Sequence, residues 1–234
     1  MINHYLERIG DSLLFPSRET FDSQFAQLDL SVPDRTEKRQ TSYRERHCCL
    51  RFFDAVVQAT LIQFPCTLVK FEDPDFLLIE NQRSVWGIEH TDFGPQEYQE
   101  VLTLAAKGKL STVSDESNAL QPNFGRVGKD EPRYAKYALS AILHKAAKLK
   151  QVPYFATHQR HLILYSMTAL NNVDVSEVSQ LVHSQMADES AKTGGPQPFA
   201  SIALVYGTQE IWLDFGSSRA PQRHITNGKP PLAV

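Results

Sequence analysis

Two acidic residues stand where a pair of strands would normally carry apolar side chains. Asp75 follows Pro74 directly, and Glu89 follows the apolar run at residues 85–88. Two carboxylates held close together repel each other and raise each other's pKa, and a cation bound between them relieves this repulsion. Mg²⁺ binds in such places through one or two carboxylates while it keeps several waters. The pair therefore predicts a Mg²⁺ or Mn²⁺ site, which can activate water and stabilise charge on a phosphoryl group.

A helix predicted at residues 134–150 offers the positive charges that such a site needs. Successive residues of a helix turn by about 100°, so one arc of this helix is apolar and faces the sheet. The arc consists of Tyr134, Ala138, Ala141, Ile142 and Leu149. Lys145 falls in the middle of the arc and Lys148 toward its edge. A lysine on a buried stripe needs an anionic partner, so we expect Lys145 or Lys148 to meet Asp75 and Glu89.

A less specific interpretation of the same residues stays open. Asp75 can cap a turn, and Glu89 can pair with a lysine at the surface. Leu139, Leu143 and Ala146 form a second apolar arc on the helix. If that second arc is the buried one, the lysines are solvated and neither acid has a role in chemistry.

The elements that must position these residues follow from apolar periodicity. A helix capped at Thr41 or Ser42 precedes three strands, and the last two strands form a hairpin around residues 81–83. The predicted elements are a short helix at 5–14, a helix at 43–64 that Pro65 stops, strands at 67–71, 76–80 and 84–91, a helix at 96–107, a long loop at 108–133, the lysine helix at 134–150, a strand at 161–167, a helix at 175–186 and a hairpin at 199–215. This order predicts an α/β (α+β) fold with a central mixed sheet flanked by helices.

Composition limits the class of protein without identifying it. The 234 residues carry a net charge of −3, which argues against a uniformly basic surface but allows a local basic groove. Three cysteines without ligand spacing predict neither a disulfide framework nor a zinc site. We found no signal peptide and no apolar run of membrane-spanning length, so we expect a cytoplasmic protein with no membrane contact.

The motifs around the two acids resemble those of the PD-(D/E)XK nuclease superfamily. Pro74-Asp75-Phe76 is similar to the first motif, and Ile88-Glu89-His90-Thr91 on the following strand is similar to the second. The continuation Ile142-x-x-Lys145-x-x-Lys148-Leu149, followed by the strand at 161–165, resembles a poorly characterised bacterial branch. The resemblance covers about residues 42–167. It implies a restriction-endonuclease-like core in a domain at 41–215, between a peripheral arm at 1–40 and a loose tail at 216–234.

The resemblance also implies roles for single residues. Asp75 and Glu89 would hold Mg²⁺ or Mn²⁺ with the backbone carbonyl of His90, and Glu45 on the preceding helix would join the site. The superfamily lysine belongs two residues after Glu89, where this chain has Thr91. In some members this lysine stands on the following helix, and here Lys145 or Lys148 would replace it.

The resemblance implies a nuclease that hydrolyses phosphodiester bonds, in DNA in preference to RNA. If neither lysine reaches the metal, the alternative is a catalytically weak or inactive binding module in a defence or mobile-element system. Tyr134 and Tyr137 are candidates for stacking on bases. Basic residues near the predicted site are candidates for phosphate contact: Lys107, Lys109, Arg126, Lys129 and Arg133. Apolar residues in both terminal regions leave a homodimer as an option.

Overall fold

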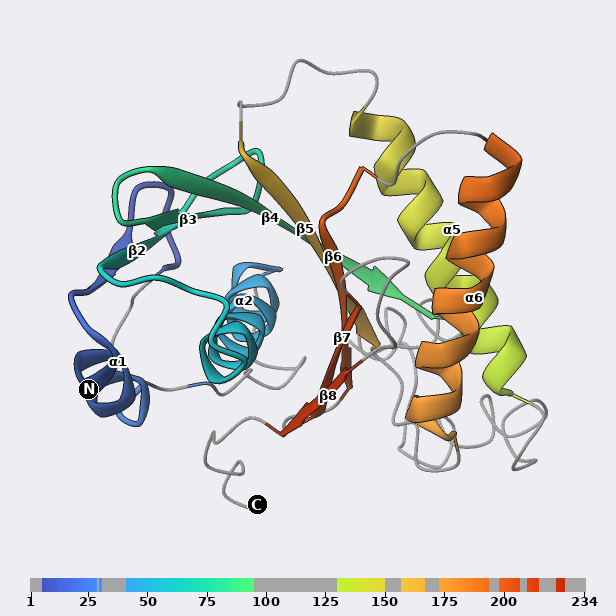
Figure 1. Cartoon of the computed structure of the whole chain (residues 1–234), viewed down its shortest axis with the longest axis horizontal. Coiled ribbons are helices and arrows are strands. Elements are labelled where there is room, and N and C mark those ends of the chain that lie inside the picture. Colours follow the sequence, from blue (N-terminus) through green and yellow to red (C-terminus); the bar gives the residue numbers. More distant parts are fainter. Residues whose placement is uncertain are drawn as a thin grey trace, which may run out of the picture.

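The computed structural model describes residues 6–28, 30, 41–94, 130–149, 157–166, 173–193, 198–206, 210–214 and 222–225. These residues form four helices and eight strands (Figure 1). The helices are α1 (Arg18–Phe25), α2 (Thr41–Gln58), α5 (Glu131–Leu149) and α6 (Val175–Thr193). The strands are β1 (Ser12–Phe15), β2 (Cys66–Lys70), β3 (Phe76–Glu80), β4 (Ser84–Phe93), β5 (Gln159–Ser166), β6 (Ser201–Tyr206), β7 (Glu210–Asp214) and β8 (Gln222–Ile225).

All eight strands belong to one sheet, and their order in space follows their order in the chain. Strands β1 to β4 pair antiparallel. Strands β4, β5 and β6 pair parallel, and β7 and β8 return to antiparallel pairing. Parallel neighbours need long crossover connections, and α5 and α6 lie within the two crossovers. The prediction of an α/β fold with a central mixed sheet flanked by helices is therefore confirmed.

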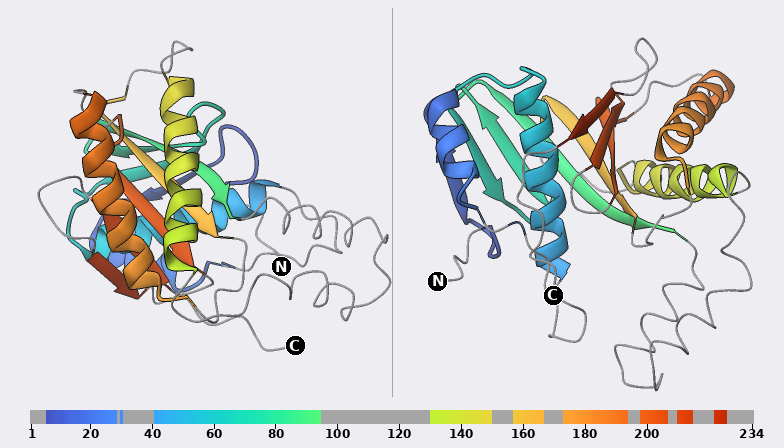
Figure 2. Two further views of the ribbon diagram at one scale, coloured as in Figure 1. Left: turned by 90° about the vertical axis from the view of Figure 1, so that its right-hand side faces the viewer. Right: turned by 90° about the horizontal axis from the view of Figure 1, so that it is seen from below.

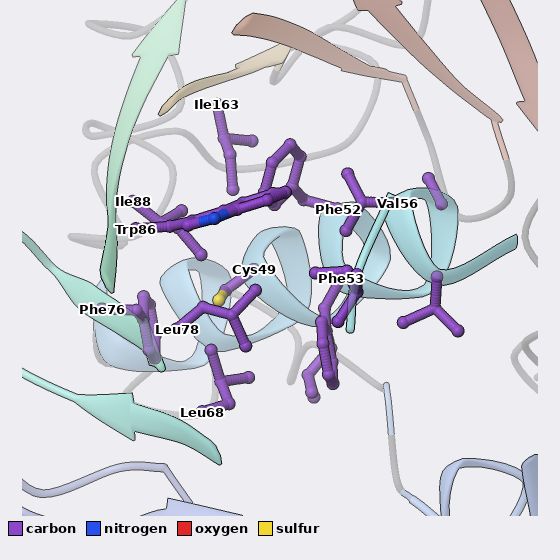
Figure 3. Close-up of a cluster of buried hydrophobic side chains, with 14 of the residues drawn as sticks. Cys49, Phe52, Phe53, Val56, Leu68, Phe76, Leu78, Trp86, Ile88 and Ile163 are labelled. Atoms are coloured by element: carbon purple, nitrogen blue, oxygen red, sulfur yellow. The ribbon is translucent and has the colours of Figure 1, made fainter. Parts of the chain in front are cut away.

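Each face of the sheet is covered by its own helices (Figures 1 and 2). Successive residues of a strand point to opposite faces. On one face, Ile88 and Ile163 pack with Phe52 of α2 in the larger core cluster (Figure 3). On the other face, Leu162 and Leu164 pack under α5 and α6. A residue in β4 or β5 therefore faces either α2 or α5, according to its position along the strand.

The elements predicted around the two acids are present. The strands expected at 67–71, 76–80 and 84–91 correspond to β2, β3 and β4. The order of α2, three antiparallel strands, α5 and the parallel strand β5 is the order that the resemblance implies. Helix α2 ends at Gln58, before the predicted end at Pro65.

The prediction of a helix at residues 5–14 is wrong. Gly10 has a positive φ of 94°, which favours glycine and interrupts a helix, and β1 then pairs with β2. The described part of residues 1–40 is also not peripheral, because Phe15 and Phe21 are buried in the cluster that contains α2. The aromatic rings of Phe15, Phe21 and Phe53 contact one another with centroids 5.2 to 5.3 Å apart.

Several predictions concern residues outside the described ranges. The helix expected at 96–107 lies outside them, and so do residues 108–129 of the predicted loop. The end of that loop is helical instead, since α5 begins at Glu131. In the predicted tail, residues 222–225 form β8 beside β7. None of the helices in the described ranges is long and apolar enough to cross a membrane.

Candidate active site

Antiparallel pairing of β3 with β4 brings Asp75 and Glu89 together. Phe76 pairs with Ile88, so Asp75, immediately before β3, lies opposite Glu89. The backbone N–H of His90 donates a hydrogen bond of 2.7 Å to Oδ2 of Asp75 and fixes its side chain. The two carboxylates therefore share one end of the hairpin, as the sequence predicted.

The surroundings of Asp75 disfavour its charged form. Burial is the largest cause, and repulsion from Glu45 and Glu89 adds to it, so the pKa of Asp75 rises from 3.8 to about 6. The hydrogen bond from His90 and the charge of Lys145 oppose this rise. A site that crowds three carboxylates in this way favours the binding of a cation or a proton.

Lys145 supplies a positive charge from α5. Its Nζ lies 2.9 Å from Oε2 of Glu89, whose side chain is 5% exposed. The helix buries Tyr134, Ala138 and Ile142, as the first apolar arc predicted, while Leu143 of the second arc is 42% exposed.

Lys148 does not share this position. It is exposed, and it forms no ion pair with another described residue. Of the two predicted lysines, the structure therefore brings Lys145 to the acids and leaves Lys148 at the surface.

Thr91 stands two residues after Glu89, on the same face of β4. It is half-buried and pairs with Leu164 of β5. Thr91 cannot donate from an ammonium group, but Lys145 reaches Glu89 from the helix above the same face. Lys145 thus lies next to the second acid, on the helix to which the resemblance assigns a displaced lysine.

The sequence interpretation missed Lys70. This lysine is 7% exposed, and its Nζ donates to Oε2 of Glu45 at 2.9 Å and to the backbone oxygen of Asp75 at 3.2 Å. Cys66, Leu68 and Lys70 alternate along β2 on the face that α2 covers. This alternation was the available signal, because a lysine that continues a buried stripe needs an acidic partner.

Glu45 is the acid that the resemblance assigned to the first core helix. It lies on α2, and its side chain is 19% exposed and bound to Lys70. It lies close enough to Asp75 to raise the pKa of that carboxyl. Glu45 therefore belongs to the same cluster as Asp75 and Glu89, with a lysine as its direct partner.

One oxygen of this cluster has no donor among the described residues. Oε1 of Glu89 is buried and accepts no hydrogen bond from them, while Oε2 contacts Lys145. A buried carboxylate oxygen without a partner is costly, and a divalent cation would satisfy it. No group of three His, Cys, Asp or Glu side chains in the described ranges is placed to hold a metal ion. A metal here would bind two carboxylates, a backbone oxygen and water, which suits Mg²⁺.

The side chain of His90 faces α2, away from Lys145, as strand alternation predicted. Nε2 of His90 lies 3.6 Å from Oδ1 of Asp92. The other carboxylate oxygen of Asp92, Oδ2, accepts a hydrogen bond from Arg44. Burial, followed by the charge of Arg44, lowers the pKa of His90 to about 3, so the imidazole is neutral near pH 7 and forms no ion pair with Asp92. In a strand, the N–H and C=O of one residue face the same neighbour, so we expect the His90 carbonyl to face Asp75.

The residues expected to contact nucleic acid are only partly described. Tyr134 of α5 is 3% exposed and belongs to the buried cluster on the α5 face of the sheet, so it is not available to stack on a base. Arg133 donates to the hydroxyl of Tyr137 at 2.9 Å. The other basic residues named for phosphate contact lie outside the described ranges: Lys107, Lys109, Arg126 and Lys129.

Gly87 allows Pro74, and with it Asp75, to approach β4 closely. A Cβ at Gly87 would lie 2.9 Å from Cγ2 of Thr157 and 3.0 Å from Cγ of Pro74. We expect Gly87→Ala to push Pro74 outward, to lower the free energy of unfolding by about 1 to 3 kcal/mol and to weaken Mn²⁺ binding several-fold. Urea unfolding and calorimetric titration with Mn²⁺ measure the two effects.

A second substitution separates these two contacts of the added methyl group. Thr157→Ala in the Gly87→Ala background removes the clash with Thr157 and leaves the clash with Pro74. We expect stability to recover in part while Mn²⁺ affinity stays low. Recovery of both quantities would mean that Pro74 does not transmit the displacement to Asp75.

Comparison of the chain with protein-family models, with curated proteins and with solved structures found no match. The geometry of the acids and lysines, together with the short motifs that carry them, is therefore the basis for assigning a function.

Proposed function

We propose that this protein is a metal-dependent nuclease that hydrolyses phosphodiester bonds in nucleic acid, in DNA in preference to RNA. The observation that carries the proposal is the 2.9 Å contact of Lys145 Nζ with Glu89, beside Asp75. Two acids and one lysine at the end of a strand pair are the groups that the resemblance to the PD-(D/E)XK superfamily requires. The preference for DNA derives from that resemblance.

The proposed reaction assigns a separate role to each residue. Mg²⁺ or Mn²⁺, when bound, would activate water and neutralise charge on the phosphoryl oxygens. Asp75 and Oε1 of Glu89 would hold the ion, with the backbone carbonyl of His90 as a third ligand. Lys145 donates from Nζ, so it would orient the attacking water and stabilise the charge that develops on the scissile phosphate.

Incubation of the purified protein with supercoiled plasmid and Mg²⁺ or Mn²⁺ tests this proposal. We expect nicked and linear products that EDTA prevents and that the double variant Asp75→Ala/Glu89→Ala does not form. A labelled RNA of the same sequence, in a parallel reaction, tests the preference for DNA. Equal cleavage by the wild type and the double variant would exclude catalysis at this site.

The alternative is a protein of the same fold without catalytic activity, which binds a partner in a defence or mobile-element system. Thr91 in the lysine position motivates this alternative. Both lysines, Lys145 and Lys148, lying out of hydrogen-bond reach of the acids would favour this alternative, and Lys145 lies within reach of Glu89. Retention of DNA in a gel-shift assay, without cleavage in Mg²⁺ or Mn²⁺, would favour the alternative.

A further inference from the structure

Two lysines neutralise the acids from opposite faces of the sheet, and they differ in how deeply they are buried. The side chain of Lys145 is 20% exposed, whereas that of Lys70 is 8% exposed. Nζ of Lys70 contacts one oxygen of Glu45 and the backbone oxygen of Asp75. It also lies 4.4 Å from the centre of the Phe76 ring. Lys70 is therefore held on several sides, deep in the cluster.

The oxygen partners of Lys70 are of the kinds that bind a hard divalent cation. Such ions take carboxylate and backbone carbonyl oxygens as ligands. Here Glu45 contributes the carboxylate from α2, and Asp75 contributes the carbonyl from the start of the hairpin. The ammonium group joins these two elements, as a bound ion would.

The charges of the cluster allow one divalent ion more readily than two. With all groups ionised, Asp75, Glu45 and Glu89 carry three negative charges, and Lys70 and Lys145 carry two positive charges. The net charge of these five side chains is then −1, and one divalent ion changes it to +1. A second ion would leave a large positive excess in a partly buried place, which is unfavourable.

We propose that the ammonium group of Lys70 occupies the position of a second divalent cation and thereby limits this site to one metal ion. This inference rests on the proposed function, because it assumes that one ion binds at Asp75 and Glu89. Lys70 is then a positioning residue, which fixes Glu45 and the backbone of Asp75 without touching the substrate. The chain itself supplies the charge that a second ion would otherwise bring.

The number of Mn²⁺ ions bound tests the proposal without any measurement of cleavage. Calorimetric titration of the full chain with Mn²⁺ gives the stoichiometry, and electron paramagnetic resonance of free Mn²⁺ checks it. We expect one ion for the wild type and two for Lys70→Met. The matched variant Lys70→Met/Glu45→Gln also lacks the carboxylate of Glu45 that would hold the second ion, so it should bind one ion.

The outcomes separate this inference from the proposed function. No Mn²⁺ bound to the wild type would remove the metal site and the proposed function with it. One ion in the wild type and one in Lys70→Met would leave the nuclease proposal standing and overturn the role of Lys70. Two ions in the wild type would overturn that role as well.

Folding of Lys70→Met gives a second readout, because the variant leaves Glu45 without its cation. If the variant is unfolded in EDTA, we expect Mn²⁺ to restore its circular dichroism spectrum, and the double variant to fold without Mn²⁺. A Lys70→Met chain that stays unfolded in Mn²⁺, beside a folded double variant, would show that an ion cannot replace the ammonium group. Lys70→Arg keeps the charge and should bind one ion, like the wild type.

Discussion

Asp75→Asn is expected to resist urea better than the wild type near neutral pH when divalent ions are absent. The asparagine keeps an oxygen that accepts the hydrogen bond from the His90 backbone. It also removes a carboxylate whose charged form is disfavoured by burial and by Glu45 and Glu89. The variant should therefore lose metal binding and cleavage while it gains stability, as expected for a residue retained for function.

The pKa of Asp75 sets the sign and the pH range of this effect. The pKa is raised from 3.8 to about 6 by folding, so the folded state binds more protons than the unfolded state between these values. The contribution of Asp75 to stability is thus fully present below pH 3.8 and is lost as the pH rises through about 6. A shift of this size corresponds to at most about 3 kcal/mol, and partial exposure of the carboxyl reduces the expected gain to about 1 to 2 kcal/mol.

Urea unfolding in EDTA across this pH range measures the difference between the two proteins. The difference should be largest near neutral pH and should vanish toward pH 3.8, where the wild-type carboxyl is protonated. Saturating Mn²⁺ should stabilise the wild type and leave Asp75→Asn unchanged. Equal stability of the two proteins at all pH values in EDTA would contradict the crowding of charge around Asp75.

Asp92→Asn is the matched control for this substitution. Asp92 lies on the same strand as Glu89, but it accepts a hydrogen bond from Arg44 and its neighbourhood is cationic. The same change of carboxylate to amide should therefore lower the stability near neutral pH. Opposite signs for the two variants would show that the effect belongs to the site of Asp75 and not to aspartate in general.

Local periodicity was enough to predict the hairpin and the lysine helix. Glu89 and Thr91 face one side of β4 because side chains alternate along a strand. Lys145 faces the same side because it follows Tyr134, Ala138 and Ile142 around the helix. These patterns repeat within a few residues, so they can be recognised without knowledge of the rest of the chain.

Contacts between distant segments account for what the sequence interpretation missed. The pair of Glu45 and Lys70 exists because α2 packs beneath the end of β2, which periodicity alone does not show. The strand β1 likewise forms by pairing with β2, across more than fifty residues, and displaces the helix predicted at 5–14. The ranking of Lys145 over Lys148 also needed the packing of α5, since both lie near one apolar arc.

Lys145→Met is expected to lower the rate of phosphodiester cleavage by roughly 10²- to 10³-fold, the usual cost of losing one donor to a developing negative charge. It should not weaken Mn²⁺ binding, because the substitution removes a positive charge from beside Glu89 and leaves Asp75 and Glu89 in place. In EDTA the variant should be destabilised by about 2 kcal/mol, because the buried carboxylate of Glu89 loses its partner.

Lys148→Met gives this prediction its sharpest comparison. The two lysines lie one turn apart on α5, and the substitutions are chemically identical. Of these two lysines, it is Lys145 that contacts Glu89. Lys148→Met should keep the cleavage rate within about twofold of the wild type, as a surface substitution away from the site does. A loss caused equally by both substitutions would indicate a general requirement for positive charge along α5. A loss of cleavage activity confined to Lys148→Met would assign the role to the exposed lysine and would contradict the assignment of Lys145.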